Sequence, residues 1–102
     1  MRIPIIGAYQ TKFGELWDKG INDLIRDAGE NVLRDAGLKS DNIGKLYVAN
    51  SFAAKTAGQA LLTSVAYEEL KISNSVLINA GDASGAVAIH EAANSIISGE
   101  SD

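Results

Sequence analysis

The chain alternates between two kinds of segment, which differ in the spacing of their hydrophobic and polar residues. Short apolar runs, typical of buried strands, are each followed by a longer segment in which apolar residues recur every three or four positions, as in a helix. This alternation favours parallel strands joined by crossover helices. The predicted strands cover residues 3–8, 45–49 and 75–79.

The first two predicted helices each have one apolar stripe. The first helix is predicted to have Asn22 as its N-cap and Asp23 in its first turn, and to end at Gly37. The second follows a loop at residues 50–58. The stripes comprise Leu24, Ile25, Ala28, Val32, Leu33 and Ala36 in the first helix, and Leu61, Leu62, Val65, Ala66 and Leu70 in the second.

The third predicted helix runs from Ala83 to about Ser98, with Asp82 as N-cap and Gly99 as the stop. Right-handed crossovers give the sheet order 3-2-1 and place the first two helices on one face. The third helix must then cover the other face. We expect its apolar arc to do so, because small residues pack closely on a sheet or on another helix. The arc comprises Gly85, Ala86, Ile89, Ala92, Ala93, Ile96 and Ile97, and a narrower polar stripe comprises Ser84, Glu91, Asn94, Ser95 and Ser98.

The predicted fold is therefore a single α/β domain over residues 1–102, with a three-stranded parallel sheet in a βαβαβα arrangement. Such a sheet has two open edges, and parallel strands are normally covered. We therefore expect this domain to associate with a partner that covers an open edge.

Composition narrows the classes of function. There is no Cys and one His, so neither a disulfide nor a Cys/His metal site is expected. The net charge is -4 and the nine basic residues are scattered, which argues against nucleic-acid binding. No apolar run approaches the roughly 18 residues of a membrane span. The start of the chain is too short for a signal peptide, and a soluble cytoplasmic protein is expected.

Candidate chemistry centres on the turn before the third helix. After the apolar run 76–78, Ala80 and Gly81 form a tight turn and Asp82 opens the helix. A helix N-terminus favours a thiolate nucleophile or a bound anion, but an aspartate already supplies a negative charge there. His90 lies eight residues on, about 12 Å along a helix and beyond hydrogen-bond reach. We therefore interpret Asp82 as a cap in preference to a nucleophile or an anion site.

Other polar and aromatic residues are given structural interpretations. Ser84 is expected to bond nearby backbone, and His90 to serve a structural or interface role. Phe13 and Trp17 are interpreted as aromatic caps over the core in preference to a ligand lid. Residues 39–42 and 68–69 are expected to be solvated surface.

Several short motifs together resemble the N-terminal portion of thiolases, especially the archaeal and sterol-carrier-protein-type branch. The match runs in order along the whole chain but covers only about a quarter of a full thiolase. It implies a minimal thiolase-like half-domain in which Asp82 occupies the position of the nucleophilic Cys. The family's catalytic His residues, second Cys and most coenzyme A contacts would lie further along. The matching motifs are Ile6-Gly7-Ala8, residues 11–14, 32–38 and 46–50, Gly58-Gln59, Ala83-Ser84-Gly85 and residues 98–102.

Three hypotheses follow, the first two from this resemblance and the third from the turn at Asp82. In the first, the chain has no catalytic residue or cofactor of its own and works as a homodimer, because the third strand of thiolases pairs antiparallel with its twin. The second is a subunit of a split acyl-CoA acyltransferase whose partner supplies Cys and His. The third is a small hydrolase or decarboxylase that uses Asp82. The dimer strand would be Ser75, Val76, Leu77, Ile78 and Asn79.

Overall fold

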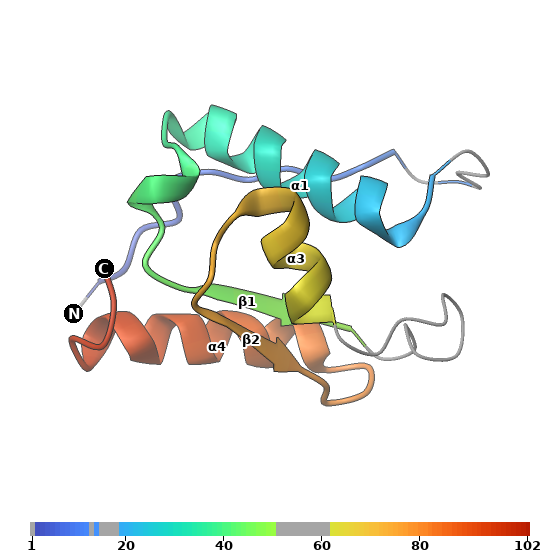
Figure 1. Cartoon of the computed structure of the whole chain (residues 1–102). Helices are drawn as coiled ribbons and strands as arrows, with labels where there is room; N and C mark the ends of the chain where they lie inside the picture. Colours follow the sequence, from blue (N-terminus) through green and yellow to red (C-terminus); the bar gives the residue numbers. More distant parts are fainter. Residues whose placement is uncertain (1, 13, 15–18, 51–61) are drawn as a thin grey trace.

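Three helices enclose a small parallel sheet in the computed structural model, which describes residues 2–12, 14, 19–50 and 62–102. Helices α1 (Ile21–Ala36) and α3 (Leu62–Leu70) lie on one side of the sheet, and α4 (Ser84–Ile97) lies on the other (Figure 1). This confirms the α/β class and the predicted division of helices between the two faces. A short 3-10 turn, η1 (Ser40–Asn42), leads into the first strand.

The sheet has two strands, β1 (Leu46–Ala49) and β2 (Ser75–Ile78), paired in parallel. Leu46 lies opposite Ser75, and Ala49 lies opposite Ile78. The second and third predicted strands are confirmed to within one residue at each end.

The predicted first strand is wrong, so the three-stranded sheet is replaced by a two-stranded one. Residues 3–8 form no strand and run beside α1 instead. The amide of Ala8 donates to the Asp35 carboxylate at 3.0 Å. A Cβ added to Gly7 would lie 2.9 Å from the Ala36 Cβ, so this segment contacts the helix closely. Pro4 has no amide hydrogen to give to a ladder, and the side-chain carboxylate takes the place of a strand partner.

The apolar core lies between the sheet and α3. Its buried side chains are those of Val65, Ala66, Leu70 and Ile72, of which the first three were predicted. Helix α1 crosses α3 where Gly29 meets Leu70, since a Cβ at position 29 would lie 2.4 Å from a Leu70 methyl group. Glycine at this crossing allows the two helices to come together. Leu61 lies outside the described residues.

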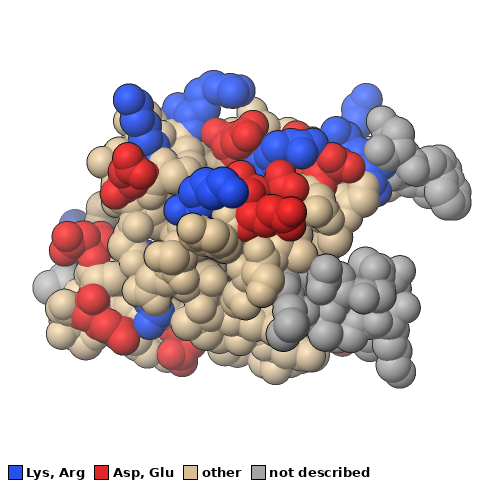
Figure 2. Space-filling view, in the orientation of Figure 1, with Lys and Arg blue, Asp and Glu red and all other residues tan. Residues whose placement is uncertain are grey.

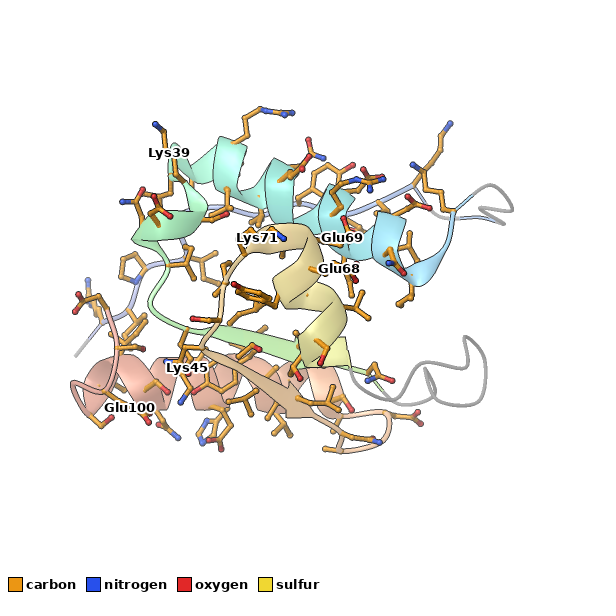
Figure 3. The ribbon with its side chains drawn as sticks, viewed as in Figure 1. Lys39, Lys45, Glu68, Glu69, Lys71 and Glu100 are labelled. Atoms are coloured by element: carbon orange, nitrogen blue, oxygen red, sulfur yellow. The ribbon has the colours of Figure 1, made fainter. Side chains whose placement is uncertain are left out.

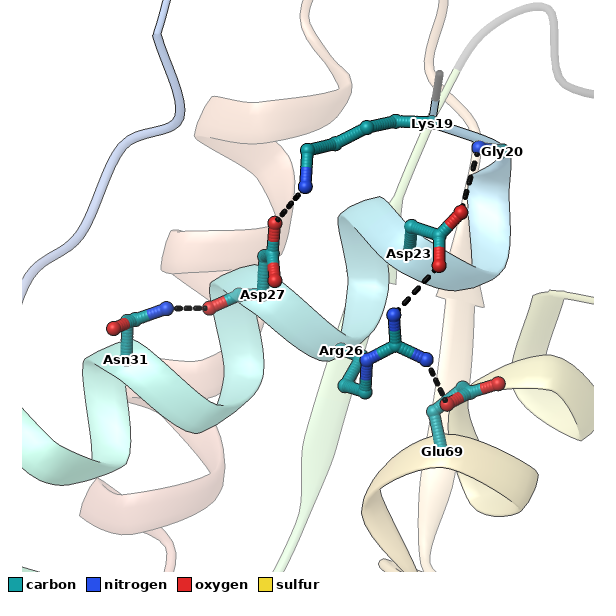
Figure 4. A network of polar contacts seen from close by, with 7 residues as sticks. All are labelled: Lys19, Gly20, Asp23, Arg26, Asp27, Asn31 and Glu69. Atoms are coloured by element: carbon teal, nitrogen blue, oxygen red, sulfur yellow. Dashed lines mark hydrogen bonds and ion pairs between the residues drawn. The ribbon is translucent and has the colours of Figure 1, made fainter.

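A polar network begins helix α1 (Figure 4). The N-cap is Gly20, so the predicted cap at Asn22 is wrong. The Asp23 carboxylate accepts the Gly20 amide at 3.0 Å and binds Arg26 at 2.6 Å. These two contacts, the amide first, lower the pKa of Asp23. Arg26 also reaches Glu69 on α3 at 3.4 Å. The Asp23 carboxylate thus accepts the amide of the N-cap residue, whereas an N-cap side chain would accept an amide of the first turn.

The far end of α1 is as predicted. Gly37 adopts the left-handed conformation with φ 72°, and its amide donates to the carbonyl of Arg34 at 3.2 Å. Glycine has no Cβ and adopts the left-handed conformation without steric conflict, so it commonly follows the last residue of a helix.

Helix α4 buries two serines of the predicted polar stripe, whereas Glu91, Asn94 and Ser98 of that stripe are exposed. Ser84 and Ser95 are buried at 3% and 4% exposure. Part of the apolar arc faces outward, with Ile89 66% and Ile97 53% exposed, while Ala92, Ala93 and Ile96 are half-buried. The expectation that the whole arc covers the sheet is therefore wrong. The reason is chemical: each buried hydroxyl has a hydrogen-bond partner, which offsets the cost of removing it from water.

Candidate functional site

The turn between β2 and α4 is held by its own backbone. Gly81 has φ 61°, a left-handed conformation. The amides of Ala83 and Ser84 donate to the carbonyls of Ala80 and Gly81, both at 3.2 Å. These bonds occupy two amides at the start of the helix, and an anion there would have to do without them.

Asp82 stands exposed at this turn. The N-cap of α4 is Ala83, so the predicted capping role of Asp82 is wrong. The reason is that the chain begins its helical turn one residue later than expected, and the Ser84 side chain takes over the contacts of the turn. The Asp82 carboxylate therefore projects toward solvent.

The Ser84 side chain stabilises the turn through hydrogen bonds to nearby backbone, as predicted from the sequence. Its Oγ accepts the amide of Ala80 at 2.8 Å and donates to the carbonyl of Gly81 at 2.7 Å. The carbonyl of Asn50, just after β1, lies 3.4 Å from the same oxygen. With its hydroxyl so engaged and buried, Ser84 positions residue 82 and is not available as a nucleophile.

His90 does not complete a catalytic pair. It is exposed and belongs to the same helix as Ser84. Six residues at about 1.5 Å each separate the two by about 9 Å along the axis, beyond hydrogen-bond reach. Among the described residues, the turn therefore has a carboxylate but no histidine base.

A second polar cluster, which sequence reasoning missed, joins α4 to β1. The hydroxyls of Tyr47 and Ser95 are hydrogen-bonded to each other, and Ser95 lies 3.1 Å from the Glu100 carboxylate. Lys45 contacts the other carboxylate oxygen at 3.2 Å and lies over the Tyr47 ring, 5.3 Å from its centroid. Figure 3 shows Lys45 at the beginning of β1 and Glu100 just past the end of α4.

The charges of this cluster stabilise each other. The hydrogen bond to Tyr47, and then that to Glu100, raises the pKa of Lys45. Lys45, and then Ser95, lowers the pKa of Glu100. A hollow of about 390 Å³ adjoins the cluster, lined also by Glu91, Asn94 and Ser98. Because every member is already bonded to another, the cluster fastens α4 to the sheet and leaves no group poised for reaction.

Two sequence signals could have revealed this cluster. Lys45 and Tyr47 alternate along one strand and so point to the same side of the sheet. Glu100 follows Ser95 by five residues, across the Gly99 stop, which has φ 79° as a helix end requires. The remaining step is to place Ser95, in the polar stripe of α4, toward the sheet.

The outer edge of β2 has no strand partner within residues 2–12, 14, 19–50 and 62–102. Leu46 and Asn50 donate to the carbonyls of Asn74 and Ile78, at 2.9 and 3.1 Å. Backbone groups of successive residues alternate between the two edges of a strand. Those of Ser75, Leu77 and Asn79 therefore face away from β1, and Leu77 is 38% exposed.

Other predicted sites have mixed outcomes. Lys39, Asp41 and Asn42 are exposed and Ser40 is half-buried, which agrees with a solvated turn. Glu68 is exposed, whereas Glu69 is half-buried against Arg26. Phe13 and Trp17 fall outside the described residues. Acidic and basic side chains intermingle over α1 and α3 (Figure 2), so that face carries no purely basic patch.

The described part of the chain holds no group of three or more His, Cys, Asp or Glu residues placed to bind a metal ion. None of its helices combines the length and apolar character that crossing a membrane requires.

The geometry defines a class: a small α/β unit that presents one residue at a strand–turn–helix elbow and whose sheet edges are unpaired among the described residues. Comparison with known proteins gives the family. The model described as the N-terminal domain of thiolase matches residues 3–102, and the chain belongs to this family.

Two curated relatives are acetyl-CoA acetyltransferases of archaea. The protein from Methanocaldococcus jannaschii is 36% identical over 102 residues, which are 98% of this chain and 26% of the relative. The protein from Methanothermobacter thermautotrophicus is 32% identical over 102 residues, 98% of this chain and 27% of the relative. The chain thus spans about a quarter of the length of these relatives.

Proposed function

We propose that this chain is a thiolase-type unit that performs no acyl transfer by itself and works through association as a homodimer. The observation that carries the proposal is the unpaired outer edge of β2, where Leu77 is 38% exposed. Antiparallel pairing of Ser75–Asn79 with the same residues of a second copy would satisfy these backbone groups. A pairing of identical edges also produces a closed two-fold dimer.

The chemistry of the elbow supports the non-catalytic part. Acyl transfer needs a nucleophile that holds the acyl group, a base that activates it and an oxyanion hole. Asp82 stands where the resemblance places the nucleophilic Cys, and His90 is directed to solvent elsewhere on α4. The chain would supply the scaffold of such a site without its reactive groups.

Light scattering tests the association. We expect the purified chain to be a dimer. The Leu77→Pro variant should have a lower mass in solution, because proline has no amide to donate to a paired strand edge. Leu77→Ala keeps that amide and serves as the matched control. Circular dichroism of both variants establishes that the helices are intact. A folded Leu77→Pro protein with unchanged mass would refute pairing through this edge.

A thioester assay tests the chemistry. With acetyl-CoA we expect no turnover by the chain, and none by Asp82→Cys, because the restored thiol still lacks a neighbouring base. The assay follows loss of thioester absorbance, which the new thiol does not disturb. Turnover by the unaltered chain that disappears in a folded Asp82→Asn protein would instead support the hydrolase or decarboxylase hypothesis.

A split acyltransferase is the second candidate, and one observation favours it. The edge of β1 away from β2 faces an apolar hollow of about 330 Å³, lined by all four residues of β1 with Tyr9, α1 and α3. A strand from a complementary subunit would add there. An adjacent gene for the rest of a thiolase, and co-purification of the two products with acyl-transfer activity, would favour this candidate over the homodimer.

A further inference from the structure

The backbone of the outer β2 edge limits how a second strand can align with it. The outward amides and carbonyls of this edge belong to Ser75, Leu77 and Asn79. The strand itself begins at Ser75. At the other end the Asn79 side chain accepts the Gly81 amide at 3.3 Å, where the turn begins. A partner strand therefore has a short, bounded set of backbone groups to meet.

One alignment of two copies uses this whole set. In an antiparallel pair, outward residues lie opposite outward residues and exchange both hydrogen bonds. With Leu77 on the two-fold axis, Leu77 pairs with its own copy, and Ser75 pairs with Asn79 of the other chain. An axis at Val76 would set Asn79 beyond the start of the other strand. An axis at Ile78 would set Ser75 against the turn at the other strand's end.

The side chains of this edge have the same symmetry about Leu77. Val76 and Ile78 are both β-branched, and both line the hollow beside α4. Ser75 and Asn79 are both polar and lie with Leu77 on the opposite face, because side chains alternate along a strand. With the axis at Leu77, β-branched residues meet β-branched residues and polar residues meet polar ones. Residues 72–80 include no charged side chain, so the pairing brings no like charges together.

Leu77, at the centre of this symmetry, is 38% exposed in the single chain. Opposite residues of a hydrogen-bonded antiparallel pair have Cα atoms about 5.5 Å apart, so two leucine side chains can touch there. We propose that the two-fold axis of the dimer passes through Leu77, which contacts the same side chain of the second copy. This assignment rests on the homodimer proposed above. It adds the feature by which the edge matches its own copy better than an unrelated strand.

Charges placed on the axis test the assignment. Only a residue on a two-fold axis faces its own copy. Leu77→Asp would set two carboxylates opposite each other, and Leu77→Lys would set two ammonium groups. For each variant alone we expect the dimer dissociation constant, measured by light scattering, to rise at least about tenfold, because facing like charges repel. An equimolar mixture of the two variants should dimerise again, since opposite charges then meet.

A matched control uses a position off the axis on the same face. Asn79 is exposed and would face Ser75 of the other copy, so neither Asn79→Asp nor Asn79→Lys brings like charges together. Each of these variants should remain dimeric alone, and mixing them should add nothing. Circular dichroism of every variant shows that the helices persist.

Disulfide trapping reads the register directly. The chain has no Cys, so introduced thiols report alone. Val76 and Ile78 would face each other as a non-hydrogen-bonded pair, with Cα atoms about 4.5 Å apart, within the range that a disulfide spans. A mixture of Val76→Cys and Ile78→Cys should cross-link about tenfold faster than either variant alone, because pairing raises the effective concentration of the two thiols. Ser73→Cys, an exposed thiol outside the pair, gives the rate of random collision.

The outcomes separate the axis from the dimer itself. A monomeric unaltered chain would refute the proposed homodimer, and the axis with it. A dimeric unaltered chain whose Leu77→Asp variant dimerises equally well would refute the axis and leave the dimer standing. Faster linking of Val76→Cys to itself than to Ile78→Cys would move the axis to Val76. Faster linking of Ile78→Cys to itself would move it to Ile78, and either result overturns the assignment.

Discussion

The two faces of the sheet are covered by opposite means. On the α3 side the contact is apolar, through Val65, Ala66 and Leu70, each no more than 6% exposed. On the α4 side the buried residues of the helix are Ser84 and Ser95, held by hydrogen bonds to the turn and to Tyr47. One sheet therefore has a hydrophobic contact above and a polar contact below (Figure 1).

The difference lies in how strictly each contact fixes position. Apolar burial is roughly proportional to area and has no direction, so α3 is positioned by close packing, as where Gly29 meets Leu70, and not by directed bonds. A buried hydroxyl must meet its partner at hydrogen-bond distance, and among the described residues no buried side-chain polar atom lacks one. The polar contact sets where α4 lies along the sheet, and Ile89 and Ile97 on the opposite side of α4 stay exposed.

The largest expected effect comes from the apolar face. Leu70→Ala should lower the free energy of unfolding by about 2–5 kcal/mol, because it removes a buried side chain at the α1–α3 crossing. Ile89→Ala, on the exposed side of α4, should change it by about 0.5 kcal/mol or less. Urea unfolding of both variants at high dilution measures the contrast. Equal losses would mean that the two faces are not built differently.

A smaller effect is expected from the polar face. Ser95→Ala should cost about 1–3 kcal/mol, because the hydroxyl of Tyr47 and the carboxylate of Glu100 each lose a hydrogen bond. The double variant Ser95→Ala with Tyr47→Phe should lose less than the two single variants summed, since neither polar group then remains. A double-mutant cycle by urea unfolding gives the coupling. Additive losses would show that the two hydroxyls do not depend on each other.

The smallest effect is expected from the ion pair between Lys45 and Glu100, beside the polar contact. The pKa of Glu100 is lowered from its ordinary 4.5, so its stabilising contribution is full above that value and is lost as the pH falls through the lower folded-state pKa. Glu100→Gln should lower the melting temperature slightly at neutral pH. The difference from the unaltered chain should shrink below pH 4.5. A difference that persists in acid would point to lost packing instead of lost charge.

Much of the fold follows from sequence periodicity. The strands at Leu46–Ala49 and Ser75–Ile78, the buried Val65 and Ala66, and the glycines that end α1 and α4 were predictable because each depends on local pattern or backbone conformation. The path of residues 3–8 was not predictable, because an apolar run indicates only that burial of the segment is favourable. Whether it joins a ladder depends on distant groups, here the carboxylate of Asp35.

The candidate site was predictable in outline only. The elbow at Asp82 and the backbone contacts of Ser84 follow from a strand–turn–helix pattern. The inward face of α4 does not, because periodicity separates two faces of a helix without saying which one turns inward. Serines at 84 and 95 look like solvent positions until their partners in the turn and on β1 are known.

Helix α1 has no buried residue along its 16 positions. It is fastened by the Gly29–Leu70 crossing, by Arg26 to Glu69 and by Asp35 to Ala8. The strands β1 and β2 have helices on both faces (Figure 1), so α1, which is covered on one side only, opens at lower free energy than they do. Its amides should exchange with deuterium before those of β1 and β2. The first step of unfolding is then the lifting of α1, which strips the cover from Leu70 and makes the core accessible to proteases while α4 still holds the sheet.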